Sequence, residues 1–168
     1  MDLNFKDYNI ENTSFFSLNG TKTQARVVNV VDGDTLVLII KLFDKYFKFY
    51  TRIDGIDTCE VHSNNKDVKE LGLVAKYRII ELLCPNKKIN EIMCITKKQI
   101  IDIFKEYVCI VNIECFDFDK YGRLLANVST LKNIDLGKTL LNEKLAYKYD
   151  GKTKLNEEEQ LELLNYSG

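Results

Sequence analysis

Three closely spaced β-strand patterns near the start of this 168-residue chain constrain its fold more than any other feature. Residues 25–31 and 35–42 are rich in Val, Ile and Leu, and the Asp32-Gly33 dipeptide between them is a strong turn signal. In residues 45–54, apolar and polar side chains alternate, as they do in a strand with one buried face. Strands this close in sequence are expected to pair as an antiparallel meander.

Two further strands and about three helices are expected in the rest of the chain. The helices are predicted at 66–83, 134–145 and about 157–164, and the strands at 108–116 and 124–129. This order of elements is typical of a five-stranded Greek-key barrel of the oligonucleotide/oligosaccharide-binding type, the OB fold, which has a helix between its third and fourth strands. We therefore predict a β-rich α+β fold built on such a barrel.

The length fits a single domain with a core large enough to fold alone. Residues 1–22 are polar and mixed, and we interpret them as an N-terminal extension. Residues 23–168 would form the OB-fold domain, with an insert near 85–106. Within the insert, residues 97–106 have the apolar spacing of a possible short helix.

The charge balance argues against a broadly basic nucleic-acid-binding surface, since the net charge is −1 and the pI is near 5.9. The charges are unevenly distributed, however. The acidic tail, residues 155–168, has four Glu and no Lys or Arg, which leaves residues 1–154 with a net charge of +3. Attraction for phosphate would therefore have to come from local clusters of basic residues.

Cysteine usage and apolar runs bear on the compartment. The five Cys are odd in number and irregularly spaced, which does not indicate a disulfide framework. The chain shows neither the pattern of a signal peptide nor an apolar run of membrane-spanning length. We therefore expect a cytoplasmic protein with no membrane partner.

Two short segments place carboxylates at the ends of predicted strands. Asp32-Gly33-Asp34 follows the first strand, and Asp57-Thr58-Cys59-Glu60 follows the third. Two carboxylates, a backbone carbonyl and waters are ligands that suit a hard cation such as calcium or magnesium. Taken alone, an Asp-Gly-Asp sequence is more often only a turn, and a single loop glutamate is more often a solvated surface charge.

Two arginines accompany these carboxylates. Arg52 ends the third strand pattern, and Arg123 closes the string Asp119-Lys120-Tyr121-Gly122-Arg123. A guanidinium is planar, always charged, and can donate two hydrogen bonds at once to a phosphate. Fixed donors of this kind stabilise charge that grows on a phosphoryl group during displacement. Either arginine in isolation would more often form a surface ion pair.

Together, in order and content, these segments resemble the staphylococcal nuclease (thermonuclease-like) family over about residues 24–154. The resemblance implies that Asp34 and Asp57 bind Ca²⁺ through their carboxylates and Thr58 through its main-chain carbonyl. Asp32 would orient ligands or water. Glu60 would be the general base that activates water.

The resemblance also implies roles for residues that contact the substrate. Arg52 and Arg123 would stabilise the phosphorane-like transition state. Lys120 and Tyr121 would contact the nucleotide phosphate, and Tyr147 and Tyr149 would lie beside a base or phosphate. For these last two tyrosines, packing within the protein is an equally good alternative.

The implied activity is calcium-dependent hydrolysis of phosphodiester bonds in DNA and RNA. One alternative is a catalytically weak or inactive OB-fold module that binds nucleic acid. Another is an interaction protein whose insert and acidic tail bind another protein. The chain departs from familiar members of the family in its acidic pI, in Cys59 where proline is common, and in the length of the insert.

Overall fold

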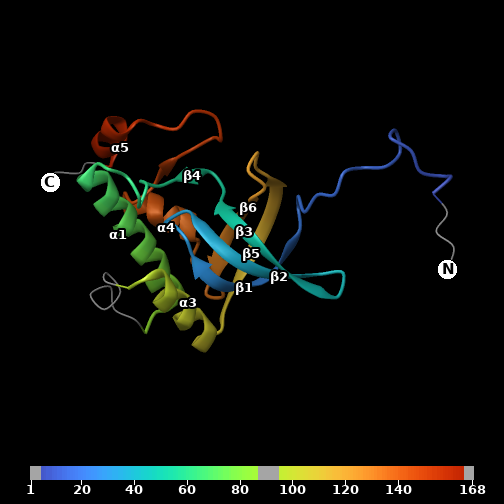
Figure 1. Cartoon of the computed structure of the whole chain (residues 1–168), viewed down its shortest axis with the longest axis horizontal. Coiled ribbons are helices and arrows are strands. Elements are labelled where there is room, and N and C mark those ends of the chain that lie inside the picture. Colours follow the sequence, from blue (N-terminus) through green and yellow to red (C-terminus); the bar gives the residue numbers. More distant parts are fainter. Residues whose placement is uncertain (1–4, 87–94, 165–168) are drawn as a thin grey trace.

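Five strands close into a barrel at the centre of the computed structural model, which describes residues 5–86 and 95–164 (Figure 1). The strands follow one another around the barrel in the order β1-β2-β3-β6-β5. Their bounds are β1 Lys22–Val30, β2 Thr35–Leu42, β3 Lys45–Ile53, β5 Cys109–Phe118 and β6 Leu124–Thr130. Strands β1, β2 and β3 form the predicted antiparallel meander, and β6 closes the barrel by pairing in parallel with β3.

The period-two pattern of the strands produces the barrel interior. Side chains at alternate positions point inward and are almost fully buried; they include Val27, Leu36, Leu38, Ile40, Ile53, Val111, Leu124 and Ala126. Burial of this apolar surface is the main favourable term in folding such a barrel. The predicted β-rich α+β fold is confirmed.

The described part of the chain has four helices, where the sequence predicted about three. They are α1 Lys66–Leu83, α3 Lys97–Glu106, α4 Leu136–Asn142 and α5 Glu157–Leu163. All four lie on one side of the barrel, whereas the β2–β3 hairpin and residues 5–21 extend to the other (Figure 1). None of the helices in these described ranges is long and apolar enough to cross a membrane.

The predicted insert contributes α3, which packs against β1, while residues 87–94 of the insert lie outside the described residues. Thr96 and Gln99 form a capping box at the start of α3, which explains why the helix begins there. Asn156 and Glu159 form the predicted capping box of α5, and residues 165–168 of the acidic tail lie outside the described residues.

A small second sheet was not predicted. Strand β4, Ile56–Asp57, pairs antiparallel with β7, Tyr147–Lys148. Strands of two residues are too short to show alternation, so no periodicity marks them in the sequence. This pairing brings Tyr147 beside Asp57 and joins the C-terminal part of the chain to the end of the meander.

Candidate active site

A buried arginine joins two buried carboxylates at one end of the barrel. Arg52 donates from Nε to Asp34 Oδ2 at 3.1 Å and from Nη2 to Asp57 Oδ1 at 2.6 Å. All three residues are at most 8% exposed. The β2–β3 register explains the contact, because Thr35 is aligned with Arg52 and the neighbouring Asp34 therefore lies within reach of the guanidinium.

Burial raises the pKa of Asp34 from 3.8 to about 6, although Arg52 partly offsets this effect. Burial alone would lower the pKa of Arg52, but the two carboxylates outweigh it and raise that pKa. The guanidinium therefore remains charged between the carboxylates. Because Asp34 still titrates high beside a cation, further positive charge nearby would favour its ionised form.

The other oxygen of Asp57 is held by two residues from the C-terminal part of the chain. The Tyr147 hydroxyl donates a hydrogen bond to Asp57 Oδ2, and Lys154 Nζ lies 3.2 Å from the same atom. Lys154 also donates to Glu60 Oε1, so it bridges a predicted metal ligand and the predicted base. Tyr147 is only 3% exposed, so its ring packs within the protein. This is the alternative to base stacking that the sequence left open.

Helix α1 supports the loops that carry these side chains. A Cβ atom built on Gly72 would lie 2.6 Å from the Cys59 carbonyl oxygen and 3.0 Å from backbone atoms of Glu60 and Val61. A Cβ on Gly33 would meet Ala75 Cβ at 2.8 Å and Thr58 Cγ2 at 3.0 Å. Gly72 therefore permits close approach between two backbone segments, and Gly33 permits close packing of its turn against the side chains of Ala75 and Thr58.

Cys59, which stands where proline is common in the family that the sequence resembles, packs inward. Its side chain is 1% exposed and lies in an apolar cluster with Val68 of α1 and Leu164. Burial raises the pKa of its thiol to about 11, so the group remains a neutral, apolar anchor. The anchor ties the segment between Thr58 and Glu60 to α1.

The oxygen atoms at this end of the barrel fit a hard cation. Asp34, Asp57 and Thr58 are all buried there, and Asp32 Oδ1 is buried with no hydrogen-bond partner among the described residues. Burial raises the pKa of Asp32, and Lys76 partly offsets this shift. Within residues 5–86 and 95–164, no three His, Cys, Asp or Glu side chains form a group suited to a metal ion. A cation held by two carboxylates and a carbonyl would thus complete its coordination with water, as calcium and magnesium do.

Arg123 is oriented by the turn that precedes it. Asp119 Oδ1 accepts from the backbone N–H groups of Tyr121 and Arg123, both at 2.9 Å, and Asp119 Oδ2 accepts from Arg123 Nε at 2.7 Å. Gly122 has a φ of +78°, a conformation that favours glycine. The string from Asp119 to Arg123 is therefore a self-contained turn that aims one arginine.

Aromatic rings lie against the cations of the site. The Arg52 guanidinium lies 4.7 Å from the centre of the Tyr149 ring, and the Arg123 guanidinium lies 5.5 Å from that of Tyr121. Lys120 Nζ lies 5.1 Å from the same Tyr121 ring. Contacts of this kind restrain both arginines while leaving their charge available to an anion.

A cleft of about 510 Å³ brings these groups together. It is lined by every residue predicted for the site except Tyr147; these are Asp32, Asp34, Arg52, Asp57, Thr58, Glu60, Lys120, Tyr121, Arg123 and Tyr149. Lys152 and Lys154 also line it and were not predicted. They lie in a short segment without periodicity, and no sequence signal pointed to them.

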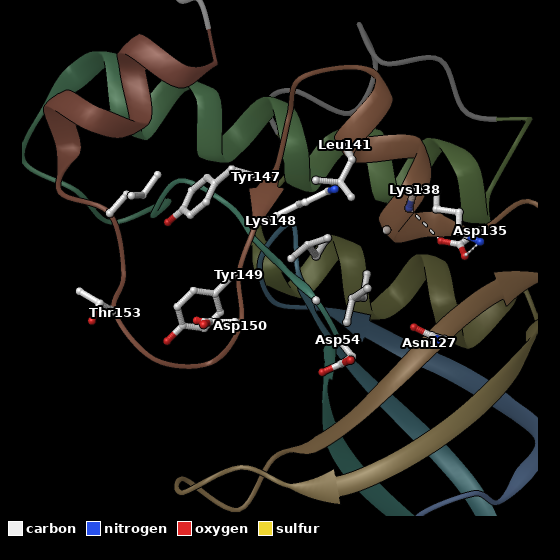
Figure 2. Close-up of a pocket in the computed structure, with 15 residues that line it drawn as sticks. Asp54, Asn127, Asp135, Lys138, Leu141, Tyr147, Lys148, Tyr149, Asp150 and Thr153 are labelled. Atoms are coloured by element: carbon white, nitrogen blue, oxygen red, sulfur yellow. Dashed lines mark hydrogen bonds and ion pairs between the residues drawn. The ribbon is translucent and has the colours of Figure 1, made fainter.

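A second cavity, of about 480 Å³, lies beside the cleft and shares Tyr149 with it. Figure 2 shows it between α4 and the loop that carries Tyr149 and Asp150, with Asp54 and Asn127 on the barrel side. Asp135 and Lys138 on its rim are paired with each other at 3.5 Å. The described residues that line it include no arrangement comparable to the carboxylate pair held by Arg52.

Comparison with known proteins identifies one family. The family model described as "Staphylococcal nuclease homologue" matches residues 50–167, which is more than half of the chain. No curated protein matches the sequence. Asp32 and Asp34 precede the matched region, but the hydrogen bond from Arg52 to Asp34 joins Asp34 to the part that matches.

Proposed function

Because the chain belongs to the staphylococcal nuclease homologue family, we propose that it hydrolyses phosphodiester bonds of DNA and RNA in the cleft at the end of its barrel. The observation that carries the proposal is the shared position of three kinds of group. A buried carboxylate pair, an accessible glutamate and two restrained arginines line one cleft. Separately, each of these groups has a purely structural explanation.

We propose Asp34, Asp57 and the Thr58 carbonyl as the residues that hold Ca²⁺. The bound cation would supply positive charge that polarises the phosphate and balances the buried carboxylates. Tyr147 and Arg52 fix Asp57 through separate oxygens, so they position this ligand. Asp32, with a buried oxygen that lacks a partner, would accept a hydrogen bond from a water in the same site.

Glu60 is the group best placed to accept a proton from the attacking water. Its side chain is 59% exposed and lines the cleft, so water can reach it. The Lys154 ammonium restrains one of its oxygens and leaves the other open to a water. Proton transfer to a positioned carboxylate makes the water a nucleophile for in-line attack on phosphorus.

Arg123 and Arg52 would stabilise the charge that develops on the phosphoryl oxygens. Each is already held by a carboxylate, so little reorganisation is needed when the substrate binds. Arg123 is 31% exposed and faces the cleft, which suits contact with the departing oxygen. Tyr149 lies against Arg52, Tyr121 lies against Arg123, and Lys120 lies against the Tyr121 ring. These three residues would contact phosphate or bases.

The proposal is tested by turnover of a single-stranded oligonucleotide in the presence of calcium. Glu60→Gln should lower kcat by about 10²-fold or more, because the base is lost. Arg123→Ala should lower it by about 10²- to 10³-fold, because a transition-state donor is lost. Glu158→Gln changes an exposed glutamate of α5 in the same way and should leave kcat unchanged. Full turnover and binding in both cleft variants would overturn the assignment.

One observation favours a second candidate, a catalytically weak or inactive OB-fold module that binds nucleic acid. Lys154 contacts both Asp57 and Glu60, so a protein cation already engages a proposed metal ligand and the proposed base. A module of this kind would bind oligonucleotides in chelator and cleave none in calcium. Binding without cleavage in a well-folded sample would therefore select this second function.

A further inference from the structure

A row of side chains on the outer face of β3 leads away from the cleft. Residues two apart on a strand share a face, so Tyr46, Lys48 and Tyr50 lie on the same face as Arg52. We call these three residues the β3 stripe. Building on the proposed function, we infer that the β3 stripe binds the part of a single-stranded nucleic acid that extends beyond the cleft.

The stripe is exposed although it is aromatic. Tyr46 is 73% exposed and Tyr50 is 60% exposed, and Lys48 is exposed between them. The β2–β3 hairpin that carries them extends away from the helices (Figure 1). In contrast, Phe49 points to the opposite face of β3, where it packs against the core and the Phe118 ring. Exposed tyrosines on a strand face are therefore not part of the barrel core.

The stripe is continuous with the proposed catalytic arginines. In the parallel β3–β6 ladder, Thr51 is aligned with Leu124 and Arg52 with Leu125. Tyr50 directly precedes this ladder on β3, and Arg123 is the residue directly before β6, so both lie at the same end of the ladder. A strand whose phosphate is held by the two arginines would therefore pass next to Tyr50.

The charge of the hairpin suits a polyanion. It carries Lys41, Lys45 and Lys48 with a single acid, Asp44, which pairs with Lys41 at 3.1 Å. Among the described residues, neither Lys45 nor Lys48 takes part in an ion pair. The hairpin is thus one of the local basic clusters that a chain with a net charge of −1 needs in order to attract phosphate.

The spacing favours unpaired nucleotides. Tyr46 and Tyr50 are four residues apart, or about 13 Å along the strand, so each ring would stack on a different base. Lys48 lies between them, in position to reach a backbone phosphate. Exposed aromatic rings interleaved with cations bind single strands, because the bases of a duplex are already stacked on one another.

The test separates the stripe from the cleft by the length of the ligand. Oligonucleotides of about 16 nucleotides, near the upper end of OB-fold site sizes, are titrated by fluorescence anisotropy into Glu60→Gln protein with calcium. Each of Tyr46→Ala and Tyr50→Ala should weaken binding by about tenfold. Lys48→Ala should reduce the salt dependence of log Kd by about 0.7. In otherwise wild-type protein, each of the three variants should cleave a dinucleotide at the wild-type rate.

Two matched variants complete the experiment. Tyr107→Ala removes a tyrosine that is 43% exposed at the end of α3 and should leave oligonucleotide binding unchanged. Tyr50→Phe keeps the ring and should retain most of the affinity. Unfolding midpoints close to that of the protein without the hairpin substitution establish that the hairpin variants are folded.

Wild-type affinity for the long oligonucleotide in the alanine variants would overturn the inference while leaving the proposed function in place. If the variants instead lose self-association or vesicle binding while oligonucleotide affinity is unchanged, the stripe is a docking surface of another kind, and the inference is also overturned. Failure of the wild-type protein to cleave the dinucleotide, with binding of the long oligonucleotide intact, would contradict the proposed function and not the stripe.

Discussion

Replacing Gly72 with alanine is expected to slow phosphodiester cleavage much more than it destabilises the protein. Gly72 lies on the face of α1 that supports the loop from Cys59 to Val61, which includes Glu60. The added Cβ would lie 2.6 Å from the Cys59 carbonyl oxygen, whereas ordinary van der Waals contact begins at 3.4 Å. The atoms it meets belong to the backbone, so no side chain can rotate away. Helix and loop would have to move apart by about 0.8 Å.

The magnitudes follow from two opposing effects. Alanine in place of glycine within a helix contributes about 1 kcal/mol of stability, and overpacking of a tight contact costs about 1 to 3 kcal/mol. The net loss in the free energy of unfolding should thus be at most about 2 kcal/mol. A displacement of about 1 Å at a catalytic group can cost as much as 10²-fold in rate, so we expect kcat to fall by about 10- to 100-fold.

The assay measures kcat on a single-stranded oligonucleotide and the urea midpoint for the same preparation. Gly137→Ala is the matched control, since Gly137 is also helical but its Cβ would meet side chains only, the nearest being Ile53 Cγ2 at 3.1 Å. The control should retain the wild-type kcat. A Gly72→Ala protein that is more stable than wild type by about 1 kcal/mol and fully active would show that α1 does not position the Glu60 loop.

Three other predictions concern the charges of the site. Arg52→Met leaves Asp34 and Asp57 without their shared cation and should lower the free energy of unfolding by about 3 to 5 kcal/mol in urea titrations at neutral pH; an unchanged midpoint would contradict the buried pairing. In calcium-free protein, burial raises the pKa of Asp34 from 3.8 to about 6. The stability that this carboxyl group contributes is therefore fully present below pH 3.8 and is lost as the pH rises through about 6. The loss should be on the order of 3 kcal/mol, and Asp34→Asn should abolish it. A contribution to stability that increases over this pH range would be contrary to the burial. Lys154→Met removes a cation 3.2 Å from Asp57 and should tighten calcium binding by about tenfold in calorimetry, whereas an unchanged affinity would show that the ammonium does not compete with the metal.

The sequence predicted most of the barrel because its signals are local. The meander follows from strand patterns separated by short turns, and this pairing brings Asp34 to Arg52. The string from Asp119 to Arg123 folds on itself through hydrogen bonds within five residues, so its arginine could be identified without knowledge of the fold.

Features that depend on distant contacts could not be predicted. Lys154 meets Glu60 across 94 positions in sequence, and neither residue stands in a pattern that marks the other. The hydrogen bond from Tyr147 to Asp57 depends on the pairing of two strands of two residues each. Gly72 reads as an ordinary interruption of a helical pattern, and only the packing of α1 reveals the loop behind it.

Cleavage of a labelled single-stranded oligonucleotide by the purified protein, with calcium and with chelator in excess, tests the central claim most directly. We expect products to appear in calcium and to be absent in chelator, and Asp57→Asn to cleave far more slowly at the same calcium concentration. A folded protein that binds the oligonucleotide but cleaves neither DNA nor RNA in calcium would contradict the claim that this cleft is a nuclease active site.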